Sequence, residues 1–189
     1  NPLNVYLRPK GKEILSNLSD VGFPGSLNEV LNDDINWLEE ESGELQNSEW
    51  SYERFQVVHT PETDPHGYML THNSGFKLLH CGDSGPCEEI EKRAYEADVI
   101  LIEMGVPDFV ESPNHHNPRQ VNALSERHPE ATILVTHNFA DAIGHEGGFQ
   151  SPELNEGIIQ LEDGDDLIIG NNGVEFMLKK NMKNNCYKY

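Results

Sequence analysis

The stretch from Phe76 to Pro86 places a carboxylate directly after a short apolar run. Its residues are Phe-Lys-Leu-Leu-His-Cys-Gly-Asp-Ser-Gly-Pro, and a short apolar run bounded by glycines favours a β-strand over a helix. Because the chain then turns and residues 88–97 have helical character, Asp83 is expected at the carboxyl end of a sheet strand, where α/β proteins build their sites. An isolated aspartate in a glycine-rich turn usually forms hydrogen bonds only with the backbone of its own loop. Whether Asp83 belongs to a functional site therefore depends on what the neighbouring strands carry.

Apolar strands and helical segments alternate along the rest of the chain. The expected strands are residues 4–7, 50–58, 68–71, 76–80, 98–103 and 131–136. The expected helices begin near Gly11, cover about 27–38 and 88–97, and run from the Asn117-Pro118 cap to Arg127. Beyond residue 157 we expect hairpins formed by 158–161, 167–169 and 174–178, followed by a polar tail at 179–189. The alternation predicts an α/β fold with helices layered on a sheet, and the run 98–103 is typical of a strand buried on both faces.

Three of these expected strands are followed by a residue whose side chain can bind metal. His59, Asp83 and His137 each follow an apolar strand, and His116 stands immediately before a capped helix. A lone histidine at a strand end is usually structural, but three successive ends of this kind indicate one shared site. Imidazole nitrogens with a carboxylate suit zinc, manganese or iron, and a carboxylate can bridge two ions about 3.5–4 Å apart. The pattern therefore predicts a two-metal hydrolase.

The remaining histidines that we considered are expected in loops or packed on strands. They are His66, His72, His80, His128 and His145. His145 is the exception that could join a site, because Gly144, Gly147 and Gly148 flank it.

Composition restricts the partners and the cellular location. The chain carries 33 acidic and 13 basic residues, for a formal charge of −20, which disfavours a long nucleic acid although bound divalent ions would offset some charge. No apolar run approaches the roughly 20 residues of a membrane span, and the first residues lack signal-peptide features. Three cysteines without zinc-type spacing fit free thiols in a reducing compartment. We expect a soluble, cytoplasmic homodimer without a membrane partner.

The order of the motifs resembles the second half of a metallo-β-lactamase-superfamily domain, in its ribonuclease Z-like phosphodiesterase branch. The resemblance rests on Val-Val-His59, Gly67-Tyr68, the Asp83 stretch, the run ending in Glu103, His116-Asn-Pro and Ile-Leu-Val-Thr-His137. It implies an αββα sandwich of which residues 1–178 supply the C-terminal portion. It also implies that His59, Asp83 and His137 bind two divalent ions, zinc or manganese, with Asp83 bridging them. His116 would lie beside the scissile phosphate, supported by Glu103.

Two departures from that superfamily shape the prediction. Its His-x-His-x-Asp-His motif does not occur in these 189 residues. We therefore expect an upstream half of the same domain as a partner, and weak metal binding without it; a degenerate, non-catalytic module is the alternative. The interval between His59 and Asp83 leaves room only for a hairpin, whereas transfer-RNA-processing members carry a long insertion there. We thus predict hydrolysis of a small or nucleotide-like phosphodiester, cyclic ones included, with a ribonuclease Z-like RNA endonuclease as the alternative.

Overall fold

The computed structural model describes residues 2–25, 34–138, 153–169 and 176–179. The chain forms two compact units, Asn1–Ser48 and Glu49–Tyr189. Within the described residues, no helix is both long and apolar enough to cross a membrane. The treatment of residues 1–178 as one portion of a single domain stays a prediction.

The first unit is a β-α-β arrangement followed by a short strand. Its elements are β1 (Leu3–Tyr6), α1 (Gly11–Gly22), β2 (Ile35–Leu38) and β3 (Ser42–Glu44). β1 and β2 pair in parallel, with Leu3 opposite Ile35, and a parallel pair needs a crossover such as α1. The helix predicted over 27–38 is wrong at its end, because Ile35–Leu38 is a strand; residues 26–33 lie outside the described part. Pairing with β1 overrides the near-helical spacing of apolar residues.

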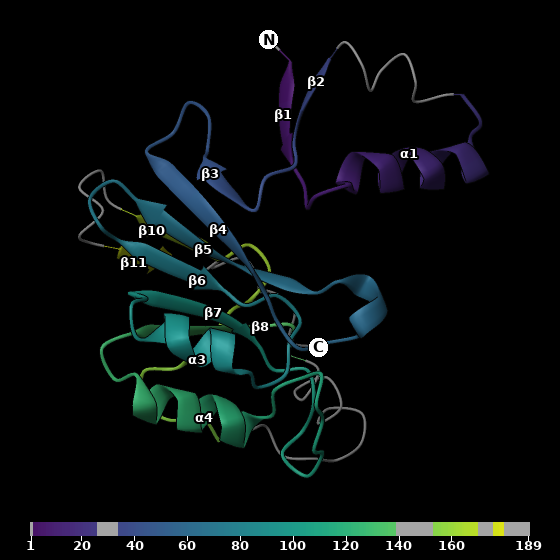
Figure 1. The fold of residues 1–189 in the computed structure, drawn as a ribbon. Coiled ribbons are helices and arrows are strands. Elements are labelled where there is room, and N and C mark those ends of the chain that lie inside the picture. Colours follow the sequence, from purple (N-terminus) through teal and green to yellow (C-terminus); the bar gives the residue numbers. More distant parts are fainter. Residues whose placement is uncertain (1, 26–33, 139–152, 170–175, 180–189) are drawn as a thin grey trace, which may run out of the picture. The chain divides into compact units, whose positions relative to one another are not determined.

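The second unit is organised around one mixed sheet (Figure 1). Its strands are β4 (Trp50–Gln56), β5 (His66–His72), β6 (Lys77–His80), β7 (Val99–Glu103), β8 (Thr132–Thr136) and β9 (Ile159–Gln160), side by side in that order. The pairs β4–β5 and β5–β6 are antiparallel, whereas β6, β7, β8 and β9 are parallel. A single turn of 3-10 helix, Pro61–Thr63, lies between β4 and β5. The interval between His59 and Asp83 is therefore filled by the predicted hairpin.

Two helices cover one face of this sheet, α3 (Glu88–Ala94) and α4 (Pro118–Arg127) (Figure 1). Ile100 and Ile102 of β7 pack into the core that includes Ile90 of α3 and Val121 of α4. Val99, one residue out of phase, packs in a second cluster with Leu134 on the opposite face. β7 is thus buried on both faces, as its unbroken apolar sequence predicts.

The start of α4 confirms the predicted cap. The Asn117 side chain accepts a hydrogen bond from the backbone N–H of Gln120, and the Gln120 side chain accepts one from the N–H of Asn117. This reciprocal capping box satisfies two donors that a helix start would otherwise leave without partners. Pro118 occupies the first helical position. The cap and the proline together fix the backbone that directly follows His116.

The strands after residue 157 pair differently from the prediction. Ile159–Gln160 does not form a hairpin with 167–169; it lies parallel to β8 at the edge of the main sheet, where it takes up backbone groups that β8 would otherwise expose. The second predicted hairpin is confirmed, because β10 (Asp166–Ile169) and β11 (Phe176–Lys179) are antiparallel. β11 includes Lys179, and residues 180–189 lie outside the described part.

Candidate metal centre

Parallel strands bring the predicted site residues to one edge of the sheet. β6, β7 and β8 run in the same direction, so their carboxyl ends lie at one edge of the sheet. Glu103 is the last residue of β7 and His137 directly follows β8, whereas Asp83 lies in the loop after β6, which ends at His80. His59 reaches the same loops through a different contact: an isolated antiparallel bridge joins Val58 to Gly85, and the Gly85 N–H donates to the Val58 carbonyl at 2.8 Å. The sheet order thus explains why residues far apart in sequence meet.

Asp83 and His137 are in direct contact. The His137 Nδ1 atom lies 2.9 Å from Asp83 Oδ1, and the two side chains are 37% and 50% exposed. His137 has a φ of 48°, a left-handed conformation that is costly for a non-glycine residue and that often marks functional positions. Both side chains therefore face solvent at the sheet edge and are close enough to act together.

His59 is held so that one ring nitrogen stays available. Its Nδ1 lies 3.0 Å from the carbonyl oxygen of Asn114, which makes Nδ1 the protonated nitrogen and leaves Nε2 as an acceptor. Metal-binding histidines are commonly oriented by a carbonyl or carboxylate in this way. The His59 ring lies 4.9 Å, centroid to centroid, from the ring of His115.

Glu103 is a buried carboxylate that connects two neighbouring histidines. It is only 1% exposed, and its Oε1 accepts a hydrogen bond of 2.6 Å from the backbone N–H of His116. The His116 imidazole lies farther from this carboxylate, with Nδ1 3.5 Å from Glu103 Oε1 and 2.6 Å from the Ser84 carbonyl. The supporting role of Glu103 stays a prediction. Charge-assisted bonds such as the one from the His116 N–H offset the cost of burying a carboxylate. Glu103 therefore links the end of β7 to the start of α4.

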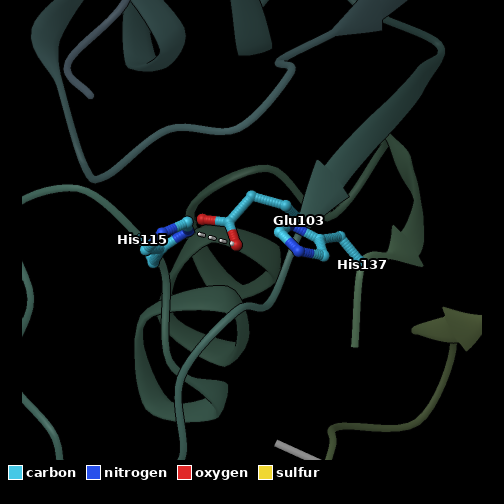
Figure 2. A group of neighbouring side chains, drawn as sticks. All are labelled: Glu103, His115 and His137. Atoms are coloured by element: carbon cyan, nitrogen blue, oxygen red, sulfur yellow. Dashed lines mark hydrogen bonds and ion pairs between the residues drawn. The ribbon is translucent and has the colours of Figure 1, made fainter. Parts of the chain in front are cut away.

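The structure adds His115, which the sequence analysis did not single out. Its Nδ1 lies 3.2 Å from Glu103 Oε2, and Figure 2 shows the Glu103 carboxylate between the imidazoles of His115 and His137. One ligand atom from each of these three residues lies within 4.8 Å of the other two. The available signal was the doublet His115-His116, of which sequence reasoning chose only the residue beside the helix cap.

Two glycines permit the close packing of these loops. A Cβ at Gly85 would lie 1.9 Å from the carbonyl oxygen of Pro113, so the Asp83 loop touches the loop that carries His115 backbone to backbone. A Cβ at Gly105 would lie 2.6 Å from Glu103 Oε2 and 2.7 Å from His115 Nδ1. The absence of side chains at both positions is a condition for the observed geometry.

Other histidines have structural partners, as predicted. His66 contacts Arg54 and Asp64, His72 contacts Glu49 and Ser74, and His128 contacts Glu91. For His80, burial lowers the imidazole pKa, opposed by its backbone hydrogen bond and by the Asp83 carboxylate. His145 lies outside the described residues.

The two described cysteines are free thiols. Cys81 is fully buried and Cys87 partly buried. Burial raises the pKa of the Cys81 thiol far above its usual range, with the nearby Cys87 and Glu103 acting in the same direction. Because a thiol binds metal as the thiolate, Cys81 is a packing residue.

A divalent ion fits the donor chemistry at this edge. His59, Asp83 and His137 offer imidazole nitrogen and carboxylate oxygen, the donors that zinc, manganese and iron accept. The contact of His59 Nδ1 with the Asn114 carbonyl leaves Nε2 as an acceptor, an orientation that metal-binding histidines commonly have.

No protein-family model matches the sequence, and no curated protein matches it. Solved structures match by fold. The metallo-β-lactamase fold protein YhfI from Bacillus subtilis superposes with a TM-score of 0.56 at 11% identity, covering 84% of this chain and 62% of that one. This chain has the metallo-β-lactamase fold. The predicted fold class is thereby confirmed. The resemblance to the metallo-β-lactamase superfamily, which rested on the order of motifs, is confirmed as a similarity of fold.

Other solved structures with this similarity are described as hydrolases. A possible metal-dependent hydrolase from Veillonella parvula matches with a TM-score of 0.55 and 14% identity, over 82% of this chain and 65% of that one. A diphosphatase from the PhnP family matches with a TM-score of 0.56 and 17% identity, over 87% of this chain and 57% of that one. The chain thus spans less than two thirds of the length of each of these three solved structures.

Proposed function

We propose that this metallo-β-lactamase-fold chain is part of a metal-dependent hydrolase that cleaves a small or nucleotide-like phosphodiester, cyclic ones included. The observation that carries the proposal is the convergence of His59, Asp83 and His137 at one sheet edge, with Asp83 and His137 only 2.9 Å apart. The fold neighbours support hydrolysis, since one is described as a possible metal-dependent hydrolase and another as a diphosphatase.

Each residue has a role that follows from its environment. His59 and His137 would hold divalent ions, and the half-exposed carboxylate of Asp83 would bridge two of them. Bound ions would supply electrophilic activation of the phosphate and a water molecule of lowered pKa. His116, oriented by the Ser84 carbonyl and by Glu103, would hold a proton beside the leaving oxygen.

Charge and topology favour a small substrate over a long RNA. The formal charge of −20 opposes a polyanion that must contact many phosphates. The hairpin of β5 and β6 occupies the interval between His59 and Asp83, so no long insertion is present there that could bind a larger substrate. A homodimer and a cytoplasmic location remain part of the proposal.

The test is a substrate comparison on metal-loaded protein. The purified protein, stripped of metal and reloaded with zinc or manganese, should hydrolyse bis-p-nitrophenyl phosphate and leave thioesters and lactams intact. Asp83→Asn keeps the shape of the side chain but cannot bridge two cations, so turnover should fall by at least about 100-fold while circular dichroism is unchanged. Asp166→Asn, at an exposed position on β10, is the matched control. Near-wild-type turnover of Asp83→Asn with full metal content would contradict the assignment.

A further inference from the structure

We propose that Glu103, His115 and His137 form a metal-binding site of their own, with His115 as a direct ligand. This set differs from the predicted ligands His59, Asp83 and His137 and shares only His137 with them. The inference deepens the proposed function and rests on it through that shared residue. All three side chains lie within the described part of this chain.

The distances between donor atoms suit one ion. With metal–ligand bonds of roughly 2.0–2.2 Å, two neighbouring ligand atoms around a zinc ion lie roughly 3–3.5 Å apart. Glu103 Oε2 and His115 Nδ1 are already 3.2 Å apart. The three candidate ligand atoms are all within 4.8 Å of one another, so a modest rotation of His137, whose ring is solvent-exposed, would complete the site.

Burial divides the site into a fixed part and an open part. Glu103 is almost fully buried, and its Oε1 is occupied by the His116 N–H, which leaves Oε2 directed at His115. The His115 side chain is 26% exposed, and its ring lies 5.9 Å from that of His137 at an interplanar angle of 71°. Because both imidazole side chains are partly exposed, solvent can reach the ion position from their side.

The donor set indicates the chemical class of the ion. Two imidazoles and one carboxylate are the ligands of many catalytic zinc sites, which keep a fourth position for water. The same set also suits iron(II) and manganese. Two neutral imidazoles and one carboxylate leave a net charge of −1, so a divalent ion would bind without excess negative charge. The proposed occupant is a divalent first-row metal ion, for which zinc and cobalt are the probes.

The competing explanation is that His115 only forms a hydrogen bond with Glu103 and orders the loop. The 3.2 Å distance between His115 Nδ1 and Glu103 Oε2 fits a hydrogen bond as well as two ligands of one ion. The two differ in how much metal affinity His115 controls. Loss of a residue that merely orients a ligand costs roughly 10–100-fold in metal affinity. Loss of a direct ligand should cost more and should change the coordination sphere itself.

The experiment compares His115→Gln with His116→Gln in the purified protein. Zinc affinity is measured by competition with a chromophoric chelator, and the visible spectrum of the cobalt-loaded protein reports the ligands. We expect His115→Gln to weaken zinc binding by more than about 100-fold and to alter the cobalt spectrum. His116→Gln should retain the affinity, because His116 contacts Glu103 Oε1 most closely through its backbone N–H. Thermal melts followed by circular dichroism verify that both variants fold.

X-ray absorption of the zinc-loaded wild-type protein gives an independent count of imidazole ligands, so the inference stays testable even if a variant does not fold. An unchanged cobalt spectrum with a loss of zinc affinity of less than about 100-fold in His115→Gln would overturn the inference, because that is the effect of a residue that only orients a ligand. If Asp83→Asn still abolishes activity in that case, the proposed function stands. If wild type itself binds neither zinc nor cobalt, both the inference and the proposed function are wrong.

Discussion

Gly85 is the point at which the Asp83 loop touches the loop that carries His115. An alanine Cβ there would lie 1.9 Å from the Pro113 carbonyl oxygen, 2.6 Å from its carbonyl carbon and 3.1 Å from the Asn114 nitrogen, whereas ordinary contact begins at 3.4 Å. The nearest atoms belong to backbone, so no side-chain rotation can make room. One of the two loops must move by more than about 1 Å.

The expected cost of Gly85→Ala follows from this overlap. Overpacking of a tightly packed site typically costs about 1–3 kcal/mol. For a chain of this size each kcal/mol lowers the melting temperature by roughly 2–4 °C, so we expect a decrease of roughly 2–12 °C. The same displacement would disturb the bond from Gly85 to Val58 and the bond from His59 to Asn114, so zinc affinity should also fall.

Melting is measured by circular dichroism, and zinc affinity by chelator competition, on the wild type, Gly85→Ala and a control. Gly22→Ala is the control, because a Cβ at that helix-end position meets nothing within 4 Å; it should melt no lower than wild type. If Gly85→Ala melts as the control does and binds zinc as wild type does, the close approach of the two loops is not a feature of the folded protein.

Three further outcomes are expected. Asn117→Ala removes the side-chain half of the α4 capping box and should cost about 1 kcal/mol in urea unfolding; an unchanged midpoint would contradict the cap. Burial raises the pKa of the Glu91 carboxyl, but hydrogen bonds from Arg127 and His128 outweigh it and leave the pKa below the usual 4.5. The stabilisation from Glu91 is therefore present above pH 4.5 and lost as the pH falls through the lowered pKa. The difference in unfolding free energy between wild type and Glu91→Gln should accordingly shrink from pH 7 to pH 3, and a constant difference would refute this. Gly105→Ala crowds side-chain atoms of Glu103 and His115, which can move, so it should lower zinc affinity while destabilising less than Gly85→Ala; an unchanged zinc affinity would contradict a metal site that contains Glu103 and His115.

Local chemistry made several features of this protein predictable from sequence. The strand before Asp83, the buried strand ending in Glu103 and the capped start of α4 follow from glycine turns, an unbroken apolar run and an Asn-Pro pair. Each signal lies within about ten residues, where backbone preferences and capping dominate. Together with the order of motifs they also indicated the metallo-β-lactamase fold.

Long-range pairing decided the rest. β2 formed a strand because β1 offers it a parallel partner, and β9 joined β8 because the sheet edge offered it backbone partners. No local pattern specifies which distant strand will be the neighbour, since register and pairing depend on packing across the sheet.

The same reasoning applies to the site. The sequence determined that His59, Asp83 and His137 stand at strand ends, but only the parallel order of β6, β7 and β8 brings the last two within 2.9 Å. His115 became a candidate because the buried Glu103 faces it. A buried carboxylate must find donors among whatever the fold places beside it, and the sequence does not contain that neighbourhood.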